Sequence, residues 1–576
     1  MADNSRYRSN KPWFDLKEFK DYDDFVANYK IDRPENFNFA FDCMDELAKE
    51  DPDKTAMVWV NDTGDKHIYT FGELKLLSDA AARYFQSIGI GQQDRVMLIL
   101  RRRAEYWICI LALMKIGAVA IPATHHLTMH DIEFRNNAAG VAAIVTTDDE
   151  YLLEHIKDSK KNSPSLRHII RIGKDDIADK EKLVGFDNLT EGIAAHMLDA
   201  DSASVDSNSS QTEISAFERV TKNEDMMLLY FTSGTTGMPK MVAHNYLYPL
   251  GHITTAKYWH NLHPGSLHLT LSDTGWAKAA WGKIYGQWLC KAAIMVYEHD
   301  QMKPSRLLKV MADNKVTSFC APPTVYRVLI NTDFKKYDLS ALEYATSAGE
   351  PLNEDVFNKF KDLTGLEIYE AYGQTESTPM VLTSKYSKPV PGSIGLINPF
   401  YDLRFLDDDC NEVEVGQEGE MCINCKPGDM GVFMGYFEND EMTAEAWRGG
   451  FYHTGDLAVQ DETGHIWFVG RSDDIIKSAG YRIGPFEVES VVQEHDSVLE
   501  CAVTGVPDPL RGQNIKVSII LNEGWEPNDQ LKKEIKRYVK ANAAAYKIPR
   551  VIEFVDELPK TISGKVRRTE IRKSTV

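Results

Sequence analysis

The chain has 576 residues, 43% of them hydrophobic, so it is long enough to build roughly three or four packed units. Its 65 Lys and Arg residues and 86 Asp and Glu residues give a formal net charge of −21, which disfavours binding to the phosphates of nucleic acid. No apolar window approaches the length of a membrane span, and residues Met1 to Lys30 read as neither a secretory signal nor a transit peptide. These features predict a cytoplasmic enzyme.

The N-terminal part of the chain alternates predicted helices and strands. Apolar residues at helical spacing over 37–47 predict a helix, and the residues after it predict a strand over 56–60. Thr70 and Glu73 form a predicted capping box at the start of the next helix. The continuous apolar run over 96–100 is typical of a buried parallel strand. This alternation favours a doubly wound α/β fold.

Further along, the character of the sequence changes twice. Residues 199–211 are rich in Asp, Ser and Asn, which predicts a solvated loop, and a second α/β unit follows. Short predicted strands with Gly and Asp turns then fill 391–470, and the C-terminal part combines strands with a helix. The strands predicted from residue 226 onward are 226–231, 293–297, 317–321, 366–372, 499–504, 516–521 and 551–555, and the C-terminal helix is 531–541.

These patterns together predict an α/β protein with two domains. The large N-terminal domain, 1–472, contains two doubly wound α/β subdomains at about 1–210 and 211–390 and a small β-rich subdomain at 391–470. A small α+β domain follows at 473–576.

The eight cysteines are spread too widely to form a dense disulfide framework. Cys422 and Cys425 form a CxxC pair, but no second pair lies at metal-ligand spacing, and the flanking residues alternate like a strand. We therefore expect a structural role for this pair.

The most informative segment follows a predicted strand and combines hydroxyl-bearing residues, glycines and a lysine. Backbone N–H and side-chain O–H groups of such a loop wrap a polyphosphate, and Lys240 supplies a cation for its charge. It is not a Walker A loop, because its glycines are too close together and no glycine precedes the lysine. The predicted phosphate-binding residues are Thr232, Ser233, Gly234, Thr235, Thr236, Gly237 and Lys240.

This loop resembles the phosphate motif of the adenylate-forming superfamily of acyl-CoA synthetases, luciferases and adenylation domains, and the resemblance extends over nearly the whole chain. The segment 349–351 is similar to the family's adenine-binding segment. The segment 372–376 resembles the motif whose threonine contacts the α-phosphate and whose glutamate holds Mg²⁺, a role that suits a carboxylate. The residues that these two motifs assign to ATP and magnesium are Gly349, Glu350, Pro351, Tyr372, Gln374, Thr375 and Glu376.

Further family motifs follow in the expected order. Asp456 matches the aspartate that accepts hydrogen bonds from both ribose hydroxyls, and Arg471 matches the arginine that reaches the ribose. Asp473 corresponds to the pivot of a hinge between the two domains, which implies that the small domain is mobile. Lys565 is similar to the catalytic lysine, whose charge stabilises the transition state at the α-phosphate. The resemblance thus implies a catalytic set of Lys565, Lys240, Thr375 and Glu376.

The resemblance also implies a reaction in two steps. The acid attacks ATP to give acyl-AMP and pyrophosphate, and rotation of the small domain then lets the acyl group pass to the thiol of coenzyme A. Gly480, Tyr481 and Arg482 are implied to line the coenzyme A passage, and Arg102 to bind its 3′-phosphate. ATP, Mg²⁺ and coenzyme A are therefore the expected cofactors and substrates. A homo-oligomer is compatible with the sequence, which does not specify the oligomeric state.

The identity of the acid depends on fewer residues. Acetate-specific relatives carry a tryptophan at the position of Gly373, so the glycine predicts room for a longer acyl chain. The segment 273–282 resembles that of medium-chain acyl-CoA synthetases, where aromatic rings, here Trp276 and Trp281, line the acyl pocket. We therefore expect a short-to-medium-chain acid. An aryl-acid CoA ligase and a stand-alone adenylation enzyme that loads a carrier protein are the alternatives. A nucleotide-binding regulator without catalytic activity is disfavoured, because binding alone does not need Lys565.

Overall fold

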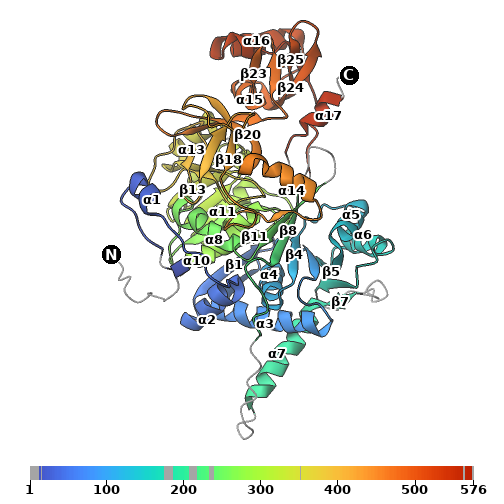
Figure 1. The fold of residues 1–576 in the computed structure, drawn as a ribbon. Coiled ribbons are helices and arrows are strands. Elements are labelled where there is room, and N and C mark those ends of the chain that lie inside the picture. The colour runs from blue at the N-terminus through green and yellow to red at the C-terminus, as the bar shows by residue number, and fades with distance from the viewer. Residues whose placement is uncertain are drawn as a thin grey trace.

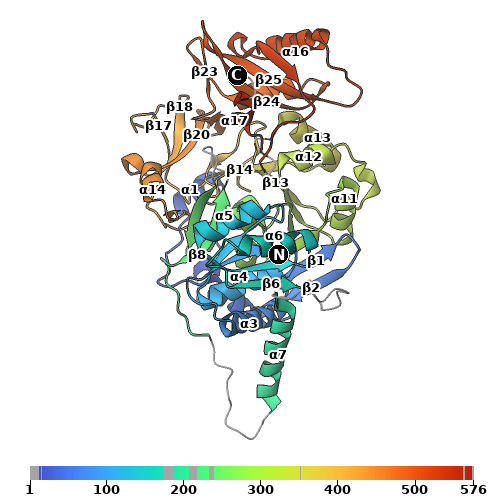
Figure 2. The same ribbon diagram turned by 90° about the vertical axis from the view of Figure 1, so that its right-hand side faces the viewer.

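The computed structural model describes residues 12–14, 16–173, 186–205, 217–232, 239–350, 352–561 and 565–573. Figure 1 shows a small C-terminal domain (red) stacked on one end of a large N-terminal domain, and Figures 1 and 2 both show helix α7 (Leu189–Val205) extending from the opposite end. Within the described ranges, no helix is both long and apolar enough to cross a membrane.

The first sheet of the large domain has the strand order β19-β9-β8-β4-β3-β5-β6-β7 and is parallel from β8 to β7. Its strands are β3 (Arg95–Ile99), β4 (Val119–Pro122), β5 (Val141–Thr147), β6 (His168–Ile172), β7 (Asp187–Asn188), β8 (Met226–Thr232), β9 (Lys240–Asn245) and β19 (Gly435–Tyr436). The helices of this part of the chain, besides α7, are α1 (Tyr22–Asn28), α2 (Glu46–Glu50), α3 (Phe71–Ser87), α4 (Glu105–Ile116), α5 (Met129–Ala139) and α6 (Glu150–Lys160).

The second sheet has the order β16-β15-β14-β13-β12-β10-β11-β1-β2 and is parallel from β14 to β1. Its strands are β1 (Thr55–Asn61), β2 (Lys66–Thr70), β10 (Leu267–Thr270), β11 (Ala293–Glu298), β12 (Ser318–Ala321), β13 (Tyr344–Ala348), β14 (Ile368–Tyr372), β15 (Val381–Leu382) and β16 (Leu396–Ile397). The associated helices are α8 (Tyr248–Ile253), α9 (Lys278–Lys283), α10 (Tyr285–Leu289), α11 (Pro304–Asp313), α12 (Pro323–Leu329) and α13 (Glu354–Thr364).

Burial explains why the apolar segments adopt these elements. Helix α4 is apolar on all sides and packs in the core of the large domain. Its one buried cation, Lys115, donates to Asp45 at 2.8 Å and Asp79 at 2.5 Å, so the charge is paired. The helix ends at Gly117, whose φ of 72° is the left-handed conformation that glycine adopts at low cost.

The two sheets do not follow the subdomain boundary expected near residue 210. Strands β1 and β2 come early in the chain but join the second sheet, because β1 pairs with β11. Strands β8 and β9 come after the boundary but join the first sheet, because β8 pairs with β4. A central strand of a parallel sheet pairs with one neighbouring strand on each side, and these neighbours need not be adjacent in the sequence. The order of elements along the chain therefore did not predict which sheet each strand joins.

Several local expectations also need correction. Helix α7 continues to Val205, so residues 199–205, the part of the predicted 199–211 loop that the structure describes, are helical, and residues 206–211 lie outside the described ranges. Only half of the predicted capping box forms: Thr70 Oγ1 accepts from the Glu73 N–H at 3.1 Å, but the Glu73 carboxylate pairs with His67 instead. The predicted helix over 37–47 is a π-helical turn, Ala40–Asp45, followed by α2.

The rest of the chain forms the β-rich unit and the small domain. The β-rich unit contains β17 (Leu403–Leu406), β18 (Glu418–Ile423), β20 (Tyr452–Gln460), β21 (Ile466–Arg471) and helix α14 (Asp440–Ala446). The C-terminal domain contains β22 (Ile476–Ser478), β23 (Tyr481–Ile483), β24 (Val498–Asp508), β25 (Gly512–Leu521), β26 (Val551–Phe554), α15 (Pro485–Gln493), α16 (Asp529–Asn542) and α17 (Arg568–Lys573). The predicted α/β architecture with a small α+β C-terminal domain is therefore confirmed.

Candidate functional site

Asp456 is the centre of a hydrogen-bonded group formed by three strands. It lies on β20 opposite Arg471 of β21, and it is 6% exposed. Tyr372 Oη and Gln374 Nε2 donate to Asp456 Oδ2 at 2.5 and 2.7 Å. Within the described ranges, both side-chain hydrogen bonds to this carboxylate are accepted by Oδ2, and none is accepted by Oδ1. Burial raises the pKa of Asp456, while the charge of Arg471 and these hydrogen bonds act against that rise.

Gln374 is held in place by residues to which the sequence assigned no role. Its Nε2 also donates to the Thr454 carbonyl at 2.8 Å, and its Oε1 accepts from Tyr452 Oη at 2.6 Å. Tyr452 is 1% exposed and lies on β20 near Asp456. Tyr452 and Thr454 belong to the same strand as Asp456. Their closeness to the aspartate in the sequence could have indicated that they support the site.

Glu376 and Lys240 meet at Tyr436, which the sequence did not single out. Tyr436 Oη donates to Glu376 Oε1 at 3.0 Å, and Lys240 Nζ lies 4.9 Å from the centroid of the Tyr436 ring. Tyr436 reaches this position because β19 pairs antiparallel with β9. One tyrosine thus contacts both groups, the carboxylate through its hydroxyl and the ammonium group through its ring.

The predicted phosphate loop connects two antiparallel strands. Thr232 at the end of β8 pairs with Lys240 at the start of β9, so the structure brings both ends of the loop together. The loop residues between them, Ser233, Gly234, Thr235, Thr236 and Gly237, lie outside the described residues.

Thr375 is positioned through its main chain by a neutral histidine. His244 Nε2 donates to the Thr375 carbonyl at 2.7 Å, so the proton of this imidazole is on Nε2. Burial lowers the pKa of His244 to about 3, which keeps the ring uncharged at neutral pH. No sequence pattern singles out His244, because its role depends on contact with a distant segment.

The predicted adenine segment begins at a glycine with a left-handed backbone. Gly349 has φ = 104°, and Lys278 Nζ donates to the carbonyl of Ala348 just before it. Glu350 Oε2 lies 3.5 Å from an Arg327 nitrogen. Pro351, the third residue of the segment, lies outside the described residues. Lys278, which sequence analysis did not assign to the ATP site, is therefore a neighbour of the adenine segment.

Lys565 reaches the large domain from the C-terminal domain. Burial is the main cause of the lowered pKa of Lys278, and the positive charge of Lys565 lowers it further. The same charge acts against the burial-driven rise in the pKa of Asp456. The Thr561 N–H donates to the Lys565 carbonyl at 2.7 Å, which closes the loop that carries the lysine. Lys565 therefore lies within electrostatic range of both ends of the proposed nucleotide site.

The hinge candidate lies where the two domains join. Arg471 Nε donates to Asp473 Oδ1 at 3.1 Å, and Arg572 Nη1 of α17 donates to the Asp473 carbonyl at 3.4 Å. Arg572 also donates to Asp474, whose second oxygen lies 3.6 Å from Arg568. The side chain of Asp473 thus contacts the large domain, while its main chain contacts the last helix of the small domain.

Two of the acyl-pocket candidates touch each other. A Cβ atom added to Gly373 would lie 2.9 Å from the outer edge of the Trp281 ring and 3.0 Å from the main chain of Pro379. The room beside Gly373 is therefore occupied by Trp281, which corrects the expectation that the glycine by itself opens space for an acyl chain. Trp281 is 5% exposed, whereas Trp276 is partly exposed in the turn before α9.

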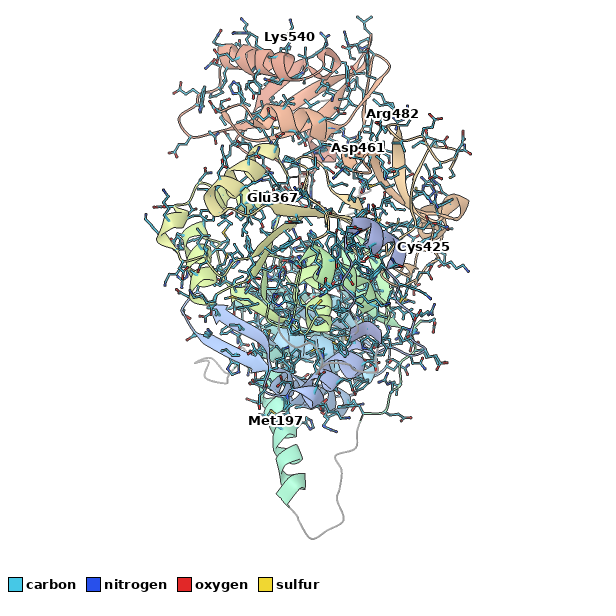
Figure 3. The ribbon with its side chains drawn as sticks, turned by 90° about the vertical axis from the view of Figure 1, so that its left-hand side faces the viewer. Met197, Glu367, Cys425, Asp461, Arg482 and Lys540 are labelled. Carbon is cyan, nitrogen blue, oxygen red and sulfur yellow. The ribbon has the colours of Figure 1, made fainter. Side chains whose placement is uncertain are left out.

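The coenzyme A candidates lie in two separate places. Gly480 and Tyr481 form the turn and start of the β22–β23 hairpin, where Tyr481 stacks on Tyr546 with a centroid distance of 4.5 Å. Arg482 Nε donates to Glu418 of β18 at 3.0 Å, and Figure 3 shows Arg482 on the side of the small domain nearer the large one, with Lys540 on its outer end. Arg102 instead donates to the His299 carbonyl. Among the described residues, no hydrogen bond or ion pair connects the hairpin with Arg102.

Cys422 belongs to a polar group behind the Asp456 strand. Its Sγ, an oxygen of Glu420 and an imidazole nitrogen of His453 lie within 4.8 Å of one another, an arrangement that could hold a metal ion. The guanidinium of Arg448 lies 2.8 Å from Glu420, which disfavours a second cation there. Glu420 Oε1 instead accepts from the Gly455 N–H at 2.7 Å, so this group supports the main chain next to Asp456.

Comparison with known proteins agrees with this arrangement. Residues 44–437 match the family described as AMP-binding enzyme, and residues 487–565 match the AMP-binding enzyme C-terminal domain. The acyl-coenzyme A synthetase ACSM3, mitochondrial, of Homo sapiens is 38% identical over 567 residues, which cover 97% of this chain and 93% of the relative. The 4-hydroxybutyrate–CoA ligase 1 of Metallosphaera sedula is 38% identical over 542 residues, which cover 93% of this chain and 90% of the relative.

A solved structure supports the same conclusion at the level of the fold. The anthranilate CoA ligase AuaEII in complex with anthranoyl-AMP is 27% identical and superposes with a TM-score of 0.82, covering 94% of this chain and 98% of that one. Two family matches in the expected order, relatives aligned over nearly their full length, and a lysine from the small domain near Asp456 agree with one another. The chain therefore belongs to the AMP-binding enzyme family and is an AMP-forming acid–thiol ligase, an acyl-CoA synthetase.

Proposed function

We propose that this acyl-CoA synthetase acts on short-to-medium-chain carboxylic acids. The observation that carries the proposal is the contact between Trp281 and Gly373, two residues before Thr375. The indole ring supplies an apolar wall directly beside the motif that holds the reacting groups, and such a wall favours an alkyl chain. The relative named 4-hydroxybutyrate–CoA ligase, whose name states a four-carbon acid, supports the lower end of this range.

In the first half-reaction, an oxygen of the acid bonds to the α-phosphorus of ATP as the bond to pyrophosphate breaks. Asp456 offers Oδ1 to the ribose hydroxyls while Tyr372 and Gln374 hold its other oxygen. Lys240 and Lys565 place positive charge near the phosphates, which offsets the charge that develops in the transition state.

Glu376 has the chemistry expected of a magnesium ligand. Its carboxylate accepts one hydrogen bond from Tyr436 through Oε1, and the ring of the same tyrosine contacts Lys240, where we expect phosphate oxygens to bind. Hard carboxylate oxygens beside phosphates are the ligands that Mg²⁺ prefers. Magnesium bound there would neutralise part of the triphosphate charge, and Glu376 is the residue that would hold it.

In the second half-reaction, the thiol of coenzyme A attacks the acyl carbon and AMP leaves. We propose that the small domain rotates about Asp473 for this step, because in the present arrangement Arg482 is held by Glu418 of the β-rich unit and Tyr481 stacks on Tyr546 within the small domain. Rotation would withdraw Lys565 and bring the hairpin to the thiol. Arg102 remains our candidate for the 3′-phosphate.

A panel of acids tests the substrate class. Acetate, butyrate, hexanoate, octanoate, benzoate and anthranilate would each be assayed for AMP formation that depends on both the acid and coenzyme A. We expect kcat/KM to be highest for one of the alkyl acids longer than acetate. A higher kcat/KM for benzoate or anthranilate would establish the aryl-acid alternative, which the likeness to an anthranilate CoA ligase makes the second candidate.

A further inference from the structure

The loop that carries Lys565 is closed at its base. The Thr561 N–H donates to the Lys565 carbonyl at 2.7 Å. The Arg567 N–H donates to the Pro559 carbonyl, also at 2.7 Å. Helix α17 begins at Arg568, directly after this base, and Figures 1 and 2 both show α17 at the end of the small domain that faces the large domain. The position of Lys565 therefore follows the position of α17.

Helix α17 is held to its own domain by Glu489 of α15. Both oxygens of the Glu489 carboxylate accept from Arg568 Nη2, at 2.7 and 2.8 Å. The same carboxylate accepts from the Val503 N–H at 2.8 Å, and its side chain is 9% exposed. Burial acts to lower the pKa of Arg568, but the charge of Glu489 and its hydrogen bonds raise it, so the guanidinium stays charged. A charge-assisted pair of this kind fixes the start of α17 to the small domain.

The same helix has a second carboxylate partner where the chain crosses between the domains. Asp474 Oδ1 accepts a hydrogen bond from Arg572, and Asp474 Oδ2 lies 3.6 Å from a nitrogen of Arg568. The Asp474 side chain is 15% exposed, so solvent screens these contacts only in part. Two arginines of α17 thus share one carboxylate of the interdomain crossover.

The main chain of Asp474 is tied to the nucleotide end of the large domain. Its N–H donates to the Arg471 carbonyl at 3.1 Å. The Ser472 N–H donates to the Gly455 carbonyl at 2.9 Å, and Arg471 lies opposite Asp456 across β20 and β21. Asp474 therefore contacts the segment of the proposed ribose residues through its main chain, and it contacts α17 through its side chain.

We propose that Asp474 is a positioning residue for adenylate formation, which holds Lys565 at the α-phosphate by way of α17. Glu489 already fixes α17 to the small domain, so the added contact with Asp474 sets where the helix stands relative to the ribose end. A misplacement of about 1 Å can cost about a hundredfold in rate, so this link matters in the first half-reaction. It matters little in the second, from which Lys565 is withdrawn. The inference rests on the proposed function, because it takes from it the role of Lys565.

Asp474→Asn tests the inference. The amide keeps the size of the side chain but removes the charge that the two arginines share. We expect kcat for adenylate formation to fall by about tenfold with KM for ATP nearly unchanged, while thioester formation from supplied acyl-AMP continues at nearly the normal rate. Asp496→Asn, at an exposed position of the small domain, is the matched control and should leave both half-reactions unchanged. A folded Asp474 variant that loses both half-reactions equally, or neither, would overturn the inference.

A double-mutant cycle separates positioning from general damage to the fold. If Asp474 acts through Lys565, its substitution has no further effect once Lys565 is gone, so the double variant should form acyl-AMP as fast as Lys565→Ala alone. Independent effects would instead multiply and make the double variant about tenfold slower than Lys565→Ala, which would overturn the inference. Single-turnover rates of acyl-AMP formation in the four proteins measure this.

A second variant keeps the test valid if Asp474→Asn does not fold. Arg572→Gln breaks the same contact from the side of α17 and leaves the pair of Arg568 with Glu489 in place. We expect the same selective loss of adenylate formation, at the melting temperature of the unmodified protein, and the same absence of any further loss in the Lys565→Ala background. A normal rate of adenylate formation in Arg572→Gln would overturn the inference.

The outcomes separate this inference from the proposed function. If Lys565→Ala slows adenylate formation but Asp474→Asn and Arg572→Gln do not, the role of Lys565 stands and the inference is wrong. If Lys565→Ala slows both half-reactions equally, the role that the proposed function gives to Lys565 is itself wrong, and the inference fails with it.

Discussion

At the scale of single residues, burial decides which groups at the site carry charge. Asp456 is buried but paired with Arg471 and two hydrogen-bond donors, so it can remain a carboxylate. His244 is buried without a charged partner, and its pKa of about 3 makes it a neutral donor to Thr375. The nucleotide end is thus built to accept hydrogen bonds, and the region behind Thr375 is built from neutral groups.

The first residue-scale prediction concerns Asp456. Asp456→Asn keeps the shape of the side chain but removes its charge and points an amide at the donors of Tyr372 and Gln374, so we expect KM for ATP to rise about tenfold or more. Steady-state kinetics with varied ATP measures this. Glu462→Gln, at an exposed turn of the same hairpin, is the control. An unchanged KM for ATP in the Asp456 variant would remove Asp456 from the ribose site.

A second prediction at this scale concerns Lys565. Lys565→Ala removes a charge needed only at the α-phosphate, so adenylate formation should slow by about a hundredfold or more, while thioester formation from supplied acyl-AMP continues at nearly the normal rate. Rapid-quench assays of each half-reaction measure this. Lys560→Ala on the same loop is the control, because Lys560 pairs with Glu500 of the small domain. Equal losses in both half-reactions would contradict the role given to Lys565.

At the scale of elements, sequence patterns predicted the strands that their own residues determine. They missed the side-chain contacts that form only when distant segments pair. The residues that form β3 are almost all apolar because both faces of this strand are buried. The strand at 96–100 was predicted from this continuous apolar run alone. Tyr436 could not be found in this way, because it meets Glu376 only after β19 pairs with β9. His244 was missed for the same reason. The motifs supplied the residues predicted to contact nucleotide, but not the residues that hold those side chains in place.

The hinge supplies the element-scale prediction about motion. Proline at 473 fixes φ, and no hydrogen bond of the Asp473 N–H within the described residues would be lost, so Asp473→Pro should selectively impair one half-reaction. Separate assays of the two half-reactions measure this. Asp473→Ala is the matched control, because it also loses the contact to Arg471 but leaves φ free. Normal rates in both half-reactions of the proline variant would place the pivot elsewhere.

The segment before α1 supplies an element-scale prediction about stability. The Glu18 carboxylate bridges Lys257 at 2.5 Å and Lys385 at 2.6 Å. Burial alone would raise the pKa of Glu18, but hydrogen bonds from Lys257, Lys385 and Tyr386 lower it to about 2. Because this pKa lies below the unfolded value, the stabilisation is present at neutral pH and is lost as the pH falls from about 4.5 towards 2.

Glu18→Gln should therefore lower the stability of the large domain at neutral pH by about 1 kcal/mol, a small value because solvent screens this half-exposed group. Thermal unfolding of the variant and the unmodified protein measures the difference, which should shrink in acid. Glu35→Gln, at an exposed position of the same region, should leave the melting temperature unchanged. A difference that stays constant down to low pH would show that the ion pairs are not its cause.

At the scale of the whole molecule, the site draws on both sheets of the large domain and on the small domain. Lys240 comes from the first sheet, Tyr372 from the second, Asp456 from the β-rich unit and Lys565 from the C-terminal domain. The sequence motifs predicted a role for all four, but their convergence depends on pairings between distant segments, such as β1 with β11 and β8 with β4. Because every unit contributes to one site, the packing between units matters for catalysis as well as for stability.

That shared interior contains a set of neutral histidines and should make the protein sensitive to mild acid. Burial lowers the pKa of His244 and His268 to about 3, and of His252 and His260 well below the usual value. These imidazoles take up protons when the protein unfolds but not while it is folded. Their contribution to stability is therefore complete above the unfolded value of 6.5 and is lost progressively below it.

Melting temperatures measured from about pH 7.5 down to about pH 5 test this, because most carboxylates do not yet titrate in that window. Each histidine contributes a slope of at most about 1.4 kcal/mol per pH unit below its unfolded pKa, so the melting temperature of the large domain should fall by several degrees. His263→Gln, at an exposed position, should leave this dependence unchanged. A melting temperature that stays constant between these limits would mean that the buried imidazoles accept protons in the folded protein, and the neutral state of His244 beside Thr375 would be contradicted.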